Sequence, residues 1–112
     1  MSRFFSTMFS VTLLCVGGLC DAAFAADPPA RTGKQVYDTA CMACHASGAA
    51  GAPKLGDATA WKARIAQGDA VMFEHVSKGF KVMPARGTCT KCTDAELKAA
   101  IAHMVAKAQE KK

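Results

Sequence analysis

The pentapeptide Cys41-Met42-Ala43-Cys44-His45 decides how the rest of this sequence is interpreted. It has the form C-x-x-C-H, in which two thiols on one helical turn can each add to a vinyl group of the same porphyrin. The imidazole that follows immediately can then bind the iron as proximal ligand. A structural disulfide or half of a zinc site would leave the adjacent histidine unexplained. The motif therefore predicts one haem c, attached through Cys41 and Cys44 and ligated by His45.

The first 25 residues have the features of a secretory signal peptide. Arg3 is followed by an uncharged run over residues 4–20, and Ala-Phe-Ala at 23–25 supplies the small residues that precede a cleavage site. We therefore predict export to the periplasm, with residues 26–112 forming a single monohaem domain. An uncleaved membrane anchor is the alternative, although the apolar run is shorter than the ~20 residues that a membrane span needs.

Met83 is the leading candidate for the second axial ligand of the iron. It lies in an aperiodic segment, and the following Pro84 favours an extended backbone there, which can aim a thioether across a pocket. Met72 and Met104 occupy core-like helical positions, and His75 would give bis-histidine ligation. A thioether ligand raises the reduction potential relative to two imidazoles. Two filled axial positions also leave no place for a substrate, so the pattern predicts a one-electron carrier and not an enzyme.

Two other function classes remain open at this stage. A small peroxidase-like haem enzyme would need Met83 to be absent from the iron or displaced from it. A metal-binding or disulfide-stabilised binding module would need no haem, but His45 argues against it.

A second C-x-x-C pair, Cys89 and Cys92, follows the Met83 segment. Thr93 stands where a haem motif would have histidine, which disfavours a second haem. The distance in sequence to the first pair exceeds the ~15–20 residues between the pairs of zinc ribbons, and no βαβ pattern supports a thioredoxin-like site. We therefore predict a structural disulfide that braces the loop after Met83.

The rest of the chain predicts an all-α domain. Residues 26–31 form an irregular lead-in fixed only by its prolines, and residues 46–52 form a loop of small side chains. The expected helices are one from the N-cap Thr32 into the haem motif, one after the N-cap Asp57, one from Asp69 to Gly79, and one after the capping box Thr93–Glu96. Residues 80–92 are expected to be a loop and residues 109–112 a solvated tail.

The order of these motifs resembles bacterial cytochrome c5, a small class I monohaem cytochrome c. The resemblance covers residues 32–107 and rests on Cys41 to His45, residues 51–56 (GAPKLG), Trp61, the Met83-Pro84 loop and the Cys89/Cys92 pair. It implies three to five helices around one haem, with His45 and Met83 axial and Cys89–Cys92 oxidised. It also implies that the Pro53 carbonyl accepts a hydrogen bond from the His45 ring, which fixes the imidazole tautomer.

The last helix departs from the family pattern. Class I cytochromes cross their first and last helices at a glycine and an aromatic residue. Gly33 and Tyr37 suit the first helix, but His103 stands at the aromatic position of the last. Either His103 packs on the crossing, or it points to solvent and Met104 packs instead.

The positive charge indicates the kind of partner. The net charge is +5, and no basic cluster carries interleaved aromatics, so nucleic acid is not expected. We predict transient docking to acidic redox proteins, the electron donor and acceptor, with possible association with membrane-bound respiratory complexes and a monomer or weak homodimer. The candidate rim is Lys78, Lys81, Arg86 and Lys91, unless these are ordinary solvated side chains. Trp61 and Arg64 either reach the haem propionates or serve as core and solvated side chains.

Overall fold

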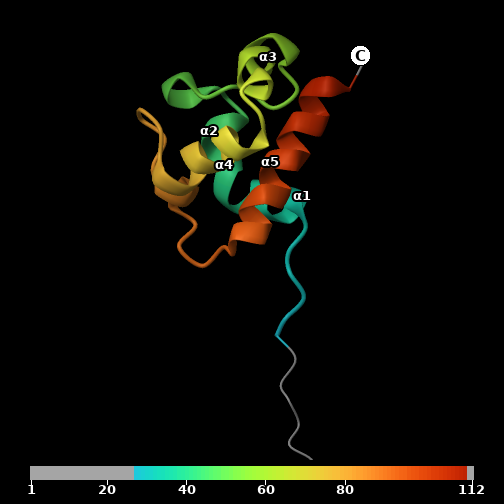
Figure 1. The fold of residues 1–112 in the computed structure, drawn as a ribbon, viewed down its shortest axis with the longest axis vertical. Helices are drawn as coiled ribbons and strands as arrows, with labels where there is room; N and C mark the ends of the chain where they lie inside the picture. The colour runs from blue at the N-terminus through green and yellow to red at the C-terminus, as the bar shows by residue number, and fades with distance from the viewer. Residues whose placement is uncertain (1–26, 111–112) are drawn as a thin grey trace, which may run out of the picture.

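The computed structural model describes residues 27–110, and the predicted all-α fold is confirmed there (Figure 1). The predicted signal peptide, residues 1–25, lies outside the described residues. The helices are α1 (Gly33–Val36), α2 (Met42–His45), α3 (Ala58–Ala66), α4 (Asp69–Lys78) and α5 (Asp94–Gln109). Short 3₁₀ turns cover Ala49–Gly51 and Ala85–Thr88. None of the helices in this part of the chain combines the length and the hydropathy that crossing a bilayer requires.

The first predicted helix is present but is not uniform. It begins at the N-cap Thr32, whose hydroxyl accepts from the Gln35 amide at 3.3 Å. A π-helical turn, Tyr37–Cys41, joins α1 to α2, and its last hydrogen bond runs from the Met42 amide to the Tyr37 carbonyl. The path from α1 to His45 is therefore continuous, with one wide turn that the hydrophobic pattern did not predict.

The next two helices begin where the sequence predicts, and α4 also ends as predicted, at Gly79. The Asp57 carboxylate accepts from the Ala60 amide at 3.0 Å and caps α3, which buries Trp61. Helix α4 is flanked by Gly68 and Gly79, both with positive φ, and it buries Met72. Glycine tolerates this backbone region without the steric cost that a Cβ brings.

Helix α5 is the common wall of both hydrophobic clusters. Leu97 and Ala100 pack with Val36, whereas Ile101 and Met104 pack in a second cluster with Tyr37, Trp61 and Met72. The predicted capping box is confirmed, because the Glu96 amide donates to the Thr93 hydroxyl and the Thr93 amide to the Glu96 carboxylate. The helix includes Gln109, one residue beyond the predicted end.

Helices α1 and α5 cross in direct backbone contact. A Cβ placed on Gly33 would lie 2.0 Å from the carbonyl oxygen of Ala99, so only glycine fits. Beside it, the rings of Tyr37 and His103 lie 5.6 Å apart at a tilt of 49°. His103 therefore takes the aromatic position, and the alternative in which it points to solvent is wrong. Met104 is buried as well.

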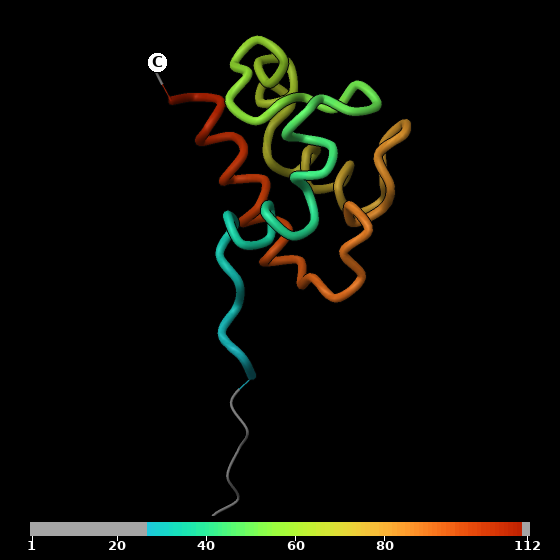
Figure 2. The backbone as a smooth tube through the Cα atoms, turned by 180° about the vertical axis from the view of Figure 1, so that it is seen from behind, coloured from blue at the N-terminus to red at the C-terminus, as the bar shows by residue number. Residues whose placement is uncertain are grey.

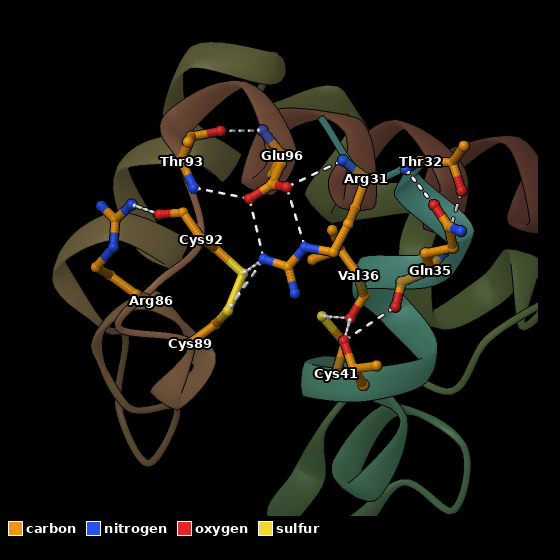
Figure 3. Close-up of polar contacts among 11 residues, drawn as sticks. Arg31, Thr32, Gln35, Val36, Cys41, Arg86, Cys89, Cys92, Thr93 and Glu96 are labelled. Atoms are coloured by element: carbon orange, nitrogen blue, oxygen red, sulfur yellow. Dashed lines mark hydrogen bonds and ion pairs between the residues drawn. A yellow bond between two sulfur atoms is a disulfide. The ribbon is translucent and has the colours of Figure 1, made fainter. Parts of the chain in front are cut away.

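The lead-in segment is fixed by an ion pair, which corrects the expectation that only its prolines hold it. The Arg31 amide and Nε each donate to Glu96 Oε1 at 3.0 Å, and Arg31 Nη2 donates to Oε2 at 3.0 Å (Figure 3). These donors, with the Thr93 amide, lower the pKa of Glu96 to about 2. One carboxylate thus joins the N-terminal segment to the start of α5.

Replacing Gly33 by alanine should unfold the helix crossing. The added Cβ would meet a backbone oxygen that cannot rotate away, so α1 and α5 must separate. We expect a loss of about 3 kcal/mol or more in the free energy of unfolding, measured by denaturant titration. Lys34→Ala, at the exposed neighbouring position, is the control and should cost less than about 0.5 kcal/mol. A stability of Gly33→Ala equal to that of the control would contradict the close contact.

The Glu96 carboxylate should make the free energy of unfolding depend on pH in the acid range. Its folded pKa of about 2 lies below the ordinary 4.5, so the carboxylate stabilises the fold above pH 4.5 and loses this effect as the pH falls towards 2. Thermal midpoints of wild type and Glu96→Gln should therefore differ at pH 7 and converge between pH 4.5 and 2. Glu110→Gln, which removes an exposed carboxylate paired with Lys107, is the control. A constant difference across this pH range would refute the assignment.

Candidate functional site

A cavity of about 520 Å³ lies between the helices and two surface turns. Its volume is within the range of sites that hold cofactors. Buried Ile101 and Met104 of α5 line its inner part, and exposed Ala50 and Val82 line its outer edge. Figures 1 and 2 show the turns at residues 46–52 and 80–83 together on the side away from α5. The cavity is predominantly apolar.

His45 is the last residue of α2 and lies in the cavity wall. Its side chain is buried, and Nδ1 lies 2.9 Å from the Pro53 carbonyl oxygen. A carbonyl oxygen only accepts, so Nδ1 carries a proton, and in the neutral ring the lone pair is then on Nε2. The backbone also holds this region, because the Leu55 amide donates to the His45 carbonyl at 2.7 Å. The contact that the resemblance implied is thus present in the structure.

The two cysteines of the motif differ in their surroundings. Both are free of disulfide bonds; Cys44 is exposed and lines the cavity beside His45. Cys41 is half-buried at the end of the π-helical turn, and its Sγ lies 4.0 Å from the Val36 carbonyl oxygen. Cys44 and His45 are therefore in the cavity wall, whereas Cys41 packs against the core clusters behind it.

Met83 lines the same cavity from a separate element. It closes a tight turn in which the Phe80 and Met83 amides donate to each other's carbonyl oxygens at 3.0 and 2.9 Å. The turn has Lys81 at φ 54° and Gly79 before it at φ 85°. Met83 is half-buried, whereas Met72 and Met104, which also line the cavity, are buried in the core.

The other candidates lie near the cavity with their own partners. His75 lines it and stacks on Phe80, with ring centroids 4.0 Å apart and planes at 17°. Trp61 lines the cavity, is 4% exposed and donates from Nε1 to the Lys54 carbonyl at 2.9 Å. Arg64 is exposed and donates to the carbonyl of its own helix at Ala60.

The predicted disulfide between Cys89 and Cys92 is confirmed. Two arginines that the sequence analysis did not assign to it surround it (Figure 3). Arg31 Nη2 lies 3.2 Å from Cys92 Sγ and 3.9 Å from Cys89 Sγ. Arg86 donates to the Cys92 carbonyl at 2.6 Å and pairs with Asp94 at 3.1 Å. Sequence spacing carries no signal for these contacts, because Arg31 is 61 residues from Cys92.

The predicted basic rim is only partly assembled. Lys81 lines the cavity and lies over the Phe80 ring, with Nζ 5.4 Å from its centroid. Lys78 pairs with Glu74 at 2.7 Å, and Arg86 is half-buried in the disulfide loop. Lys91 is exposed but is not part of the cavity wall. Of the four predicted cations, only Lys81 borders the cavity.

The residues present fit a covalently bound haem. The thiols of the C-x-x-C-H motif are free, and the His45 imidazole keeps one nitrogen lone pair for iron. A soft thioether donor, Met83, lines the same apolar cavity from another element.

Comparison with known proteins shows what this chain is similar to. The family model described as cytochrome c oxidase, cbb3-type, subunit III matches residues 28–104. The chain is 45% identical over 109 residues to cytochrome c-555 of Chlorobaculum tepidum. The alignment covers 94% of this chain and 96% of that protein. It is 47% identical over 78 residues to cytochrome c5 of Azotobacter vinelandii, covering 67% and 93% of the two chains.

A similar fold occurs in the crystal structure of an electron transfer complex of nitrite reductase with cytochrome c. The TM-score is 0.66 at 47% sequence identity, and the match covers 69% of this chain and 94% of that chain.

The turn that holds Met83 should depend on Gly79. A Cβ there would lie 2.9 Å from the Met83 carbonyl oxygen and 3.0 Å from the Ala85 amide nitrogen. Gly68 is a matched control, because its backbone angles are nearly the same but nothing lies within 4 Å of its Cβ position. We expect Gly68→Ala to cost about 1–2 kcal/mol in unfolding free energy. Gly79→Ala should cost about 1 kcal/mol more and shift the Met83 amide resonance. Equal costs and an unmoved resonance would exclude the contact.

Proposed function

This chain belongs to the cytochrome c family, in which haem c is attached through two cysteines, and we propose that it is a one-electron carrier of the periplasm. In this proposal the haem is bound to Cys41 and Cys44, with His45 and Met83 as the axial ligands. The observation that carries it is that His45 and Met83 line one cavity from two different elements. The bound haem supplies one-electron redox chemistry.

The protein's own residues orient the two ligands. The Pro53 carbonyl holds the His45 ring in the tautomer that leaves Nε2 free to bind iron. The two backbone hydrogen bonds between Phe80 and Met83 fix the position of the Met83 backbone, from which the thioether side chain extends. Ile101 and Met104 make the inner cavity apolar and exclude water, which favours the less charged, reduced state of the site.

Two protein ligands on the iron would also argue against an enzymatic function. With both axial positions filled, no position remains for a substrate, so we propose a carrier and not an enzyme. Export is proposed from residues 1–25, whose charge and small-residue pattern is that of a signal peptide.

The proposed partners are acidic redox proteins that dock briefly at the cavity edge. Phe80 and Val82 are exposed there, Val82 by 71%, and Lys81 lies between them. A small apolar patch with a cation and a net charge of +5 suits weak, electrostatically steered association. A similar chain in an electron transfer complex with nitrite reductase supports a redox protein as the partner.

Replacement of Met83 tests the ligand set. In holoprotein from a host that attaches haem c, the wild type should show a low-spin spectrum with the charge-transfer band of thioether-bound ferric iron. Met83→Ala and Met83→His should both lose this band. The reduction potential should fall in Met83→His because imidazole favours ferric iron more than thioether does.

Two other methionines of the cavity wall provide controls. Met72→Leu and Met104→Leu replace thioethers that line the same cavity, and both should keep the band. A high-spin wild type, or a band that survives Met83→Ala, would overturn the proposed ligation and favour an exchangeable, peroxidase-like site.

A further inference from the structure

We propose that the Cys89–Cys92 disulfide is a thiol–disulfide exchange site for a C-x-x-C dithiol reductant, opened at Cys89 with Arg31 stabilising the Cys92 thiolate. This would be a second redox centre of the protein, separate from the cavity. It does not depend on the proposed ligand set of the iron.

The position of the Arg31 guanidinium carries the proposal. Its Nη2 lies 3.2 Å from Cys92 Sγ and 3.9 Å from Cys89 Sγ, and Figure 3 shows it facing both sulfurs. The same nitrogen donates to Glu96 Oε2 at 3.0 Å. An Nη nitrogen carries two hydrogens, so one can serve the carboxylate and the other the sulfur. A guanidinium beside a thiol stabilises its thiolate form.

The other charges near the sulfurs leave this hydrogen bond in place. Glu96 offsets the charge of Arg31 but also fixes its side chain with two contacts. Asp94 is paired with Arg86 at 3.1 Å. Cys92 directly precedes the N-cap of the 16-residue α5, whose positive end also favours a thiolate.

The two sulfurs differ in burial, which assigns their roles. Cys92 is 4% exposed, whereas Cys89 is half-buried between exposed Thr88 and Thr90. An incoming thiolate would attack Cys89 Sγ, form a mixed disulfide and break the S–S bond, so that Cys92 leaves as a thiolate held by Arg31. The second thiol of the reductant, once deprotonated, displaces Cys89, which takes up a proton. The reductant becomes a disulfide, and two electrons enter this chain.

The loop is also held without the covalent bond. The Cys92 amide donates to the Cys89 carbonyl at 3.3 Å, and Arg86 Nη2 donates to the Cys92 carbonyl at 2.6 Å. These contacts do not involve sulfur, so the two thiols remain close after reduction. Exchange at this site is therefore reversible, without unfolding of α5.

The experiment measures disulfide opening in the holoprotein with its haem reduced beforehand by ascorbate. In holoprotein whose signal peptide, with Cys15 and Cys20, has been removed, Cys41 and Cys44 are bonded to haem, so Cys89 and Cys92 are the cysteines left for alkylation. The protein is equilibrated with mixtures of reduced and oxidised dithiothreitol. Free thiols are then trapped with iodoacetamide, and the mass of the protein is measured by mass spectrometry. Wild type should carry two alkyl groups when trapped under reducing mixtures and none when it is returned to oxidising mixtures before trapping, and it should keep its folded spectrum throughout. Arg31→Ala should need about a tenfold higher ratio of reduced to oxidised dithiothreitol, equivalent to about 30 mV.

Lys34→Ala removes a cation three positions from Arg31 in the sequence that pairs with Asp38, and it should leave the ratio unchanged. A second measurement needs no variant: in the reduced wild type, the alkylation rate of Cys92 should reach half its maximum below pH ~8.5, the pKa of a free thiol. A disulfide that stays closed in folded wild type, an Arg31→Ala ratio equal to wild type, or a Cys92 midpoint at or above that pH would overturn the proposal.

Discussion

The backbone contact between Gly33 and Ala99 is the constraint on which the site depends. It fixes α1 against α5, and α1 runs without a break through the π-helical turn to His45. Because α5 also supplies Ile101 and Met104 to the inner wall, one crossing sets both the direction of the haem motif and the depth of the cavity. Side-chain packing around Tyr37 and His103 then adds to a geometry that the backbone already imposes.

The segment that carries Met83 in the opposite wall is held mainly by polar contacts, and the Phe80 ring also stacks on His75. The segment from Gly79 to Thr93 contains only one short turn of helix, and its side chains contribute little to the core apart from Cys92. Its order comes from the Phe80–Met83 backbone pair, the disulfide and the two arginines at Cys92. The α5 side of the cavity is therefore held by packing, and the segment that follows α4 is held mainly by hydrogen bonds and the disulfide.

The features that the sequence predicted correctly depend on contacts between residues that are close in the sequence. Caps at Thr32, Asp57 and Thr93 act within three residues, so the helix starts were predictable from the sequence alone. The C-x-x-C-H motif and the Cys89–Cys92 pair are equally local. Arg31 was missed because its partners are 61 and 65 residues away. The basic rim was overestimated because proximity in sequence to Met83 does not determine which way a side chain points, and Arg86 turns toward Cys92.

The helix crossing at Gly33 is joined to the haem motif through the π-helical turn Tyr37–Cys41, so the orientation of His45 depends on the number of residues between them. Each residue of an α-helix advances about 100° around the axis, so losing or gaining one between Gly33 and Cys41 would turn His45 away from the cavity. Evolution along this stretch is therefore constrained in length as well as at the buried positions Gly33, Val36 and Tyr37, whereas exposed positions such as Lys34 can vary.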